Sequence, residues 1–161
     1  MIQIQEYKEE YAKELSEIIL SNMYKINIID HGKEIIDKIA VGFTEDAIKN
    51  SFPNRTKCFV ATENGIVVGT ASIDRFWGDE TGHKYIILTV FVSMEHHHKG
   101  IGKMLIQEIE KFANKIGVKE LVIPASVHAC EFYRKLGYDY INGIKEQNEE
   151  KEYMLVKRFD N

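Results

Sequence analysis

The segment from residue 85 to residue 117 limits the fold more than any other part of the sequence. Residues 85–92, YIILTVFV, are almost continuously apolar and rich in β-branched side chains, which predicts a central strand buried on both faces. The turn HHHKGIG, residues 96–102, follows this strand after the short segment 93–95. Apolar residues then recur at helical spacing and predict a helix that Gly117 ends, namely Ile101, Met104, Leu105, Ile109, Phe112, Ala113 and Ile116.

The remaining segments extend this into a mixed α/β pattern. The first residues predict a short strand followed by a helix from Tyr11 and by helical pieces at 30–40 and 44–52, with Thr44 as an N-cap. An Asn-Gly pair at 64–65 predicts a β-hairpin. The later segments are predicted as a strand, a helix and two closing strands at residues 119–124, 127–136, 138–141 and 151–159.

Length and charge exclude several classes of protein. The chain has 161 residues, enough for about one domain with a sizeable core. It has no apolar run of roughly 18 residues and no apolar leader, so neither a membrane span nor a signal peptide is expected. A net charge of −4 with interspersed signs argues against nucleic-acid binding. Cys58 and Cys130 have no metal-ligand spacing and predict free thiols in a reducing cytoplasm.

A glycine turn between a strand and a helix predicts an anion site. The first N–H groups of a helix lack partners and the helix dipole favours negative charge there, while glycines let an anion approach the backbone. The Walker pattern fails because its first glycine would fall at His97 and its last residue at Met104. The dinucleotide pattern GxGxxG fails because its third glycine would fall at Leu105.

Three interpretations of this turn remain open: a metal site, a solvated charged loop and a pyrophosphate cradle. A metal site is disfavoured because adjacent histidines point in different directions and Glu95 adds only one oxygen ligand, so no metal is expected. We favour the cradle, in which the backbone N–H groups from His97 to Lys103 do most of the binding.

Two motifs resemble the GNAT superfamily of acyl-CoA N-acyltransferases. Gly100 and Gly102 match the superfamily's glycine turn after the central strand, with His97 in place of the usual Arg or Gln and Met94 where Pro is frequent. The segment SVHACEFYRKLGYDY, residues 126–140, resembles the second motif. Ser126 replaces an Asn there, and the residues that match are Ala129, Phe132, Tyr133, Gly137 and Tyr138. The resemblance spans roughly residues 57–158.

This resemblance implies an α/β (α+β) fold with a twisted, mixed, mostly antiparallel sheet of about six to seven strands, flanked by helices and splayed at the central strands. Residues 1–161 would form a single acetyltransferase domain, with an acceptor-side part at 1–55 and a coenzyme-binding core at 57–158. Acetyl-CoA would be the co-substrate. The residues implied to bind it are Val90, Phe91, Val92, His97, His98, Lys99, Gly100, Ile101, Gly102, Lys103, Ser126, Ala129, Phe132 and Tyr133.

The resemblance also implies the reaction. An acetyl group would pass to a primary amine of a small molecule or peptide by direct attack in a ternary complex, with Tyr133 as the catalytic group facing the coenzyme sulfur. The central strand carries no carboxylate, so the general base is unassigned. Tyr133 as a core aromatic and Cys130 as a nucleophile are the local alternatives. The rival functions are a non-catalytic acyl-CoA-binding or sensor module and a nucleotide or phosphosugar enzyme. The chain would act as a monomer or homodimer.

Overall fold

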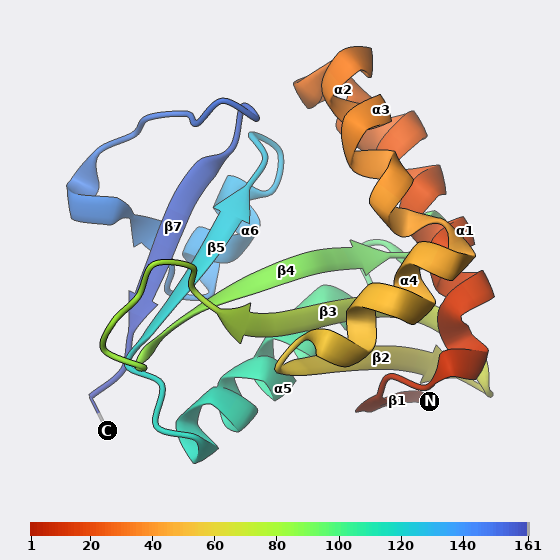
Figure 1. Ribbon diagram of the computed structural model, residues 1–161, viewed down its shortest axis with the longest axis horizontal. Coiled ribbons are helices and arrows are strands. Elements are labelled where there is room, and N and C mark those ends of the chain that lie inside the picture. The colour runs from red at the N-terminus through yellow and green to blue at the C-terminus, as the bar shows by residue number, and fades with distance from the viewer. Residues whose placement is uncertain (161) are drawn as a thin grey trace.

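The computed structural model describes residues 1–160 and shows a seven-stranded sheet with helices on both faces (Figure 1). The strands are β1 (Ile2–Glu6), β2 (Lys57–Glu63), β3 (Ile66–Arg75), β4 (Lys84–Val92), β5 (Glu120–Ala125), β6 (Asp139–Tyr140) and β7 (Tyr153–Arg158). The helices are α1 (Ala12–Asn22), α2 (Ile28–His31), α3 (Lys33–Ala40), α4 (Glu45–Ser51), α5 (Ile101–Lys115) and α6 (Cys130–Lys135). A π-helical stretch, Met23–Asn27, joins α1 to α2. None of the helices formed by residues 1–160 is long and apolar enough to cross a membrane.

The sheet opens at its centre. Its strand order is β1-β2-β3-β4-β5-β7-β6, and only β4 and β5 run parallel. These two strands pair over residues 84–86 and 120–122 and then diverge, as the green and cyan arrows of Figure 1 show. The expected mixed, mostly antiparallel and splayed sheet is therefore confirmed.

Alternating side chains of the strands support helices on opposite faces. On β2, Phe59 and Ala61 pack in one core cluster with Leu105 of α5. Their neighbours Cys58 and Val60 pack in the other, with the N-terminal helices. This alternation is the period of two that a strand imposes. Each face of the sheet therefore has its own core.

Two predictions about elements next to the opening are wrong in part. On β4, Ile86 and Ile87 are buried but residues 88–92 are only half-buried, because β5 no longer covers this end of the strand. The helix predicted from about residue 127 begins at Cys130. Residues 127–129 form a turn instead, in which the N–H groups of Ala129 and Cys130 donate to the Ser126 carbonyl.

Candidate functional site

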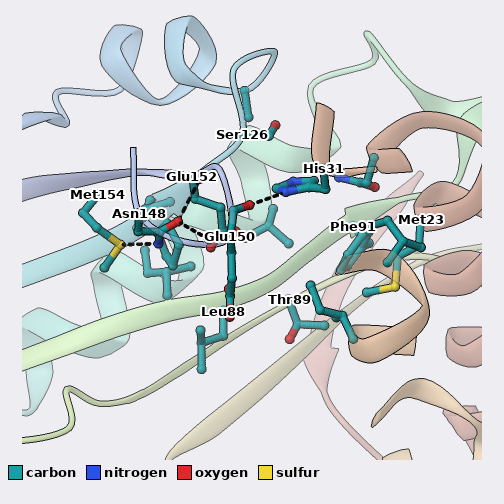
Figure 2. A pocket seen from close by; sticks show the side chains of 18 of the residues that line it. Met23, His31, Leu88, Thr89, Phe91, Ser126, Asn148, Glu150, Glu152 and Met154 are labelled. Carbon is teal, nitrogen blue, oxygen red and sulfur yellow. Dashed lines mark hydrogen bonds between the residues drawn. The ribbon is translucent and has the colours of Figure 1, made fainter. Parts of the chain in front are cut away.

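A cavity of about 750 Å³ lies where β4 and β5 diverge. Its walls come from β4, the segment from β5 to α6, the N-terminal helices and the acidic segment before β7, which is residues 146–152. Figure 2 shows His31 and Met23 on one side and Asn148 and Met154 on the other, with Thr89 of β4 below them. Residues far apart in the sequence therefore face one another across the opened sheet.

The structure brings one group of the predicted residues to this cavity. The predicted residues that line it are Val90, Phe91, Ser126, Ala129 and Tyr133. The glycine turn at residues 97–103 does not line the cavity but contacts β4 and α6, two of the elements beside it. His97 bonds to Val92 at the end of β4, and Gly102 lies against Phe132 of α6. The two predicted groups are therefore adjacent.

A β-bulge reshapes β4 at the cavity. Ser72 of β3 pairs with Leu88, but two residues earlier Thr70 pairs with Phe91, so β4 carries one extra residue. Thr89 lies in this bulge with a φ of 56°, a conformation that β-branched residues rarely adopt. Strained backbone of this kind persists only where surrounding contacts enforce it.

The bulge leaves peptide groups of β4 facing the opening. The Ser93 N–H donates to the Val68 carbonyl of β3 at 2.8 Å. Because peptide groups alternate along a strand, those of Val90 and Val92 point away from β3. The Val92 carbonyl accordingly accepts from Asn22 Nδ2, outside the sheet, at 3.0 Å. The N–H groups of Val90 and Val92 thus face the side from which β5 has withdrawn.

Arg55 holds the bulge in place. Its Nη1 donates to Thr89 Oγ1 at 2.8 Å and to Ser72 Oγ at 2.7 Å. The guanidinium carbon lies 4.4 Å from the centroid of the Phe52 ring. Arg55 is half-buried, and this burial lowers the pKa of its guanidinium from the ordinary value.

Replacing Arg55 by leucine should therefore lower the free energy of unfolding by about 1–3 kcal/mol, because both hydroxyls lose their donor. The matched control is Arg75→Leu on the same hairpin, whose side chain is exposed and whose loss should cost at most about 0.5 kcal/mol. Urea unfolding measures both. Equal stability of the two variants would show that Arg55 does not support the bulge.

The glycine turn has the form of an anion cradle. Gly100 has a φ of 79°, and a Cβ at this position would meet nothing within 4 Å. Within residues 1–160, the peptide N–H groups of residues 98–103 have no acceptor. They surround the N-terminus of α5, where the helix dipole adds positive potential. The turn thus offers donors and open space together.

Gly102 has a different reason to be glycine. A Cβ here would lie 3.2 Å from the ring of Phe132, so the missing side chain lets α6 pack against the start of α5. From the sequence alone, both glycines are predicted to admit a ligand to the backbone. The structure supports open space at Gly100 and close packing at Gly102.

The histidines beside the turn point in different directions. His97 Nε2 donates to the Val92 carbonyl at 2.8 Å, so this side chain joins the turn to β4. His98 has a φ of 63°, and its ring is perpendicular to that of His97. Across residues 1–160, no group of three or more His, Cys, Asp or Glu side chains could hold a metal ion.

Tyr133 brings a phenol to the cavity. Its side chain is 6% exposed and packs against Phe132 and Tyr138, and its hydroxyl has no hydrogen-bond partner in the described part of the chain. Burial, and next the charge of Glu152, raise the pKa of Tyr133 well above its ordinary value. The phenol therefore stays protonated near neutral pH and is available as a proton donor.

Cys130 does not have the environment of a nucleophile. It is buried, and burial chiefly raises the pKa of its thiol. A reactive cysteine needs the opposite shift, which positive neighbours or a helix N-terminus normally provide. This favours the interpretation of Cys130 as a small core residue.

From the sequence, the acidic loop at residues 146–150 is either solvated or helps to attract a cationic amine, but its contact with α2 is not predicted. Glu149, Glu150 and Glu152 line the cavity, and no lysine or arginine is among its described lining residues. His31 is 6% exposed, and its Nδ1 donates to the Glu150 carbonyl at 2.6 Å. These partners are 119 positions apart and form no motif, so only the charge of the acidic segment signals its role.

One carboxyl of this wall, that of Glu152, has a raised pKa. Glu152 is half-buried, whereas Glu149 and Glu150 are exposed. Burial, followed by the neighbouring charge of Glu150, raises the pKa of Glu152 to about 7. The cavity therefore holds a carboxyl that exchanges a proton near neutral pH and a phenol that keeps its own.

Comparisons with known proteins agree with this geometry. Residues 20–138 match the family model of the acetyltransferase (GNAT) family. No curated protein sequence matches the chain. Among solved structures, the PaiA N-acetyltransferase from Thermoplasma acidophilum in complex with coenzyme A superposes with a TM-score of 0.81 at 20% identity, over 99% of each chain.

Two other structures are similar over most of their length. A GNAT family acetyltransferase from Staphylococcus aureus has a TM-score of 0.74 at 18% identity, covering 98% of this chain and 99% of that one. A GNAT family acetyltransferase from Brucella melitensis in complex with acetyl-CoA has a TM-score of 0.67 at 19% identity, covering 100% and 90%. At these identities the similarity establishes the fold.

Proposed function

Because this chain belongs to the acetyltransferase (GNAT) family, we propose that it transfers the acetyl group of acetyl-CoA to a primary amine by direct attack in a ternary complex. Similar structures hold coenzyme A or acetyl-CoA. The observation that carries the proposal is the divergence of β4 from β5, which leaves peptide groups of β4 unpaired beside Tyr133 and next to an anion cradle.

The residues of the turn fit the pyrophosphate of the coenzyme. The free N–H groups of residues 98–103 would hold its oxygens, with Lys99 and Lys103 adding positive charge. Val90 and Val92 would bond the pantetheine arm as if it were another strand, along the edge that β5 leaves open. Ser126, Ala129 and Phe132 would border the same path.

The acidic wall favours a cationic acceptor. The cavity is lined by three carboxylate side chains and by neither lysine nor arginine among its described residues. In a half-buried site, uncompensated negative charge attracts a cation and repels an anion. An alkyl ammonium ion fits this potential, and residues 1–55, which supply the opposite wall, would form the acceptor side.

The side chains and peptide groups at the cavity suit acyl transfer. Acetyl-CoA supplies an already activated thioester, so positioning and charge stabilisation remain for the protein. The Val92 N–H would donate to the thioester oxygen. Tyr133 keeps its proton near neutral pH and would donate it to the leaving sulfur. We expect no metal requirement, and the enzyme would act in the cytoplasm.

Thiol release from acetyl-CoA in the presence of a panel of primary amines tests this function. We expect amine-dependent release that rises with the positive charge of the acceptor. A non-catalytic acyl-CoA-binding module would bind coenzyme A without releasing thiol, and a nucleotide or phosphosugar enzyme would bind a ligand that lacks pantetheine. Either result would contradict the proposal.

A further inference from the structure

The proposed reaction needs a proton acceptor, since an ammonium ion has no lone pair for attack. The titratable side chains that line the cavity are His31 from α2, Tyr133 from α6, and Glu149, Glu150 and Glu152 from the segment before β7. Among its described lining residues, β4 and β5 contribute none. A side chain that accepts this proton must therefore come from outside the central strands.

We propose that Glu152 is the general base that takes the proton from the acceptor ammonium, an assignment that rests on the proposed function. In the net reaction, the nitrogen loses two protons, the C–S bond breaks as the C–N bond forms, and the sulfur gains one proton. Glu152 accepts the first proton and passes it to solvent. The second restores the phenol of Tyr133 after that phenol has protonated the sulfur.

The backbone fixes Glu152 at the edge of the cavity. Asn148 Oδ1 accepts from the Glu152 N–H at 2.9 Å and from the Glu150 N–H at 3.0 Å, and the Asn148 N–H donates back to the Glu152 carbonyl at 2.9 Å. Figure 2 shows Asn148, Glu150 and Glu152 together on the side of the cavity that faces His31. Glu152 thus stands at a fixed position one residue before β7.

Two further observations select Glu152. Its two acidic neighbours are exposed and keep contact with solvent, whereas Glu152 is half-buried. Tyr133 is 6% exposed, and its hydroxyl has no hydrogen-bond partner in the described part of the chain. The hydroxyl lies close enough to Glu152 for the charge of that carboxyl to raise the pKa of Tyr133. A proton acceptor and a proton donor therefore line the same cavity from two elements.

The pKa of about 7 is consistent with this role, because a general base works best when its pKa lies near the working pH. Burial and the charge and hydrogen bond of Glu150 raise the value, while the hydrogen bond from Asn148 lowers it. No lysine or arginine of the described lining residues offsets the rise.

His31 takes a positioning role. Its Nδ1 must carry the proton, because the Glu150 carbonyl can only accept. This bond ties α2 to the segment that carries Glu152. The second nitrogen, Nε2, makes the imidazole the alternative base, and the experiment must distinguish the two residues.

The test compares Glu152→Gln with Glu146→Gln, an exposed glutamate of the same segment outside the cavity. At pH 7.5, Glu152→Gln should lower kcat/KM for the amine by about 10²–10⁴-fold and remove the acidic limb of the pH–rate profile. The Glu146→Gln variant should match the wild type. Affinity for coenzyme A, measured by calorimetry, should be unchanged in both.

A readout without substrate accompanies the kinetics. The pKa of Glu152 is 4.5 in the unfolded chain and about 7 in the folded protein. Between these two pH values the folded protein holds the proton more tightly than the unfolded chain does, so the fold loses stability as the pH rises and Glu152 ionises. Glu152→Gln should therefore melt roughly 2–8 °C higher than the wild type at pH 8 and at nearly the same temperature at pH 4.

Three results would overturn the assignment. If Glu152→Gln keeps both its activity and the acidic limb of the pH–rate profile, Glu152 is not the general base, and the proposed function still stands. Loss of the limb in His31→Gln together with its survival in Glu152→Gln would identify the imidazole instead. If the wild type binds coenzyme A but acetylates no amine, the proposed function fails and this assignment fails with it.

Discussion

Replacing Gly100 by leucine should weaken coenzyme A binding by about 100-fold or more. The leucine side chain would enter the open space over the N–H groups of residues 98–103 and displace a phosphate oxygen. Each charge-assisted hydrogen bond lost in this way is worth about 1.5–3 kcal/mol, and 100-fold corresponds to about 2.7 kcal/mol. Calorimetric titration with coenzyme A measures the effect.

The chain contains a matched control at the other end of the same helix. Gly117 has a φ of 81° and, as at Gly100, a Cβ there would meet nothing within 4 Å. Leucine at either site must adopt the left-handed conformation, which costs about 1–2 kcal/mol of stability. Gly117→Leu should therefore lose stability as Gly100→Leu does, with normal affinity for coenzyme A. Equal affinities in the two variants would exclude the cradle.

Replacing Tyr133 by phenylalanine should lower kcat by about 10²-fold or more and leave affinity for acetyl-CoA nearly unchanged. The ring and its packing against Phe132 remain, but the proton donor is lost. The hydroxyl has no partner within residues 1–160, so its removal should not lower the melting temperature. Steady-state kinetics and thermal unfolding test both expectations.

The neighbouring Tyr138 is the control, because its hydroxyl is hydrogen-bonded within the core and does not line the cavity. It is buried, and its hydroxyl donates to Glu110 Oε2 at 2.7 Å, away from the cavity lining. Tyr138→Phe removes one of the two donors to this carboxylate, which keeps only Lys157 Nζ at 2.9 Å, and should lose about 1–3 kcal/mol of stability while keeping its turnover. If Tyr133→Phe keeps its turnover when chemistry limits the rate, Tyr133 is a core aromatic only.

Local features of the fold could be predicted because their causes are local. The Asn64–Gly65 pair adopts φ values of 52° and 81°, as an Asn-Gly hairpin turn requires. Thr44 caps α4 by accepting from the Ala47 N–H at 3.2 Å. The glycine turn before α5 was also predictable, since the pattern of strand, turn and helix lies within one continuous segment.

The rest of the site depends on contacts between distant residues. The apolar run at 85–92 indicated a strand buried on both faces, but the divergence of β5 exposes its end to the cavity. The bulge at Thr89 is enforced by Arg55, which lies 34 positions earlier. Glu152 and His31 acquire their roles only after folding brings the acidic segment against α2, and no local pattern marks that contact.

Hydrogen–deuterium exchange with and without coenzyme A tests most directly whether the opening between β4 and β5 is the transfer site. We expect slower exchange on coenzyme binding in peptides that cover residues 90–103 and 126–133. Exchange in β1 and β2, which lie away from the opening at the far edge of the sheet, should not change. Protection of β1 and β2 without protection of residues 90–103 would contradict the assignment of the opening as the transfer site.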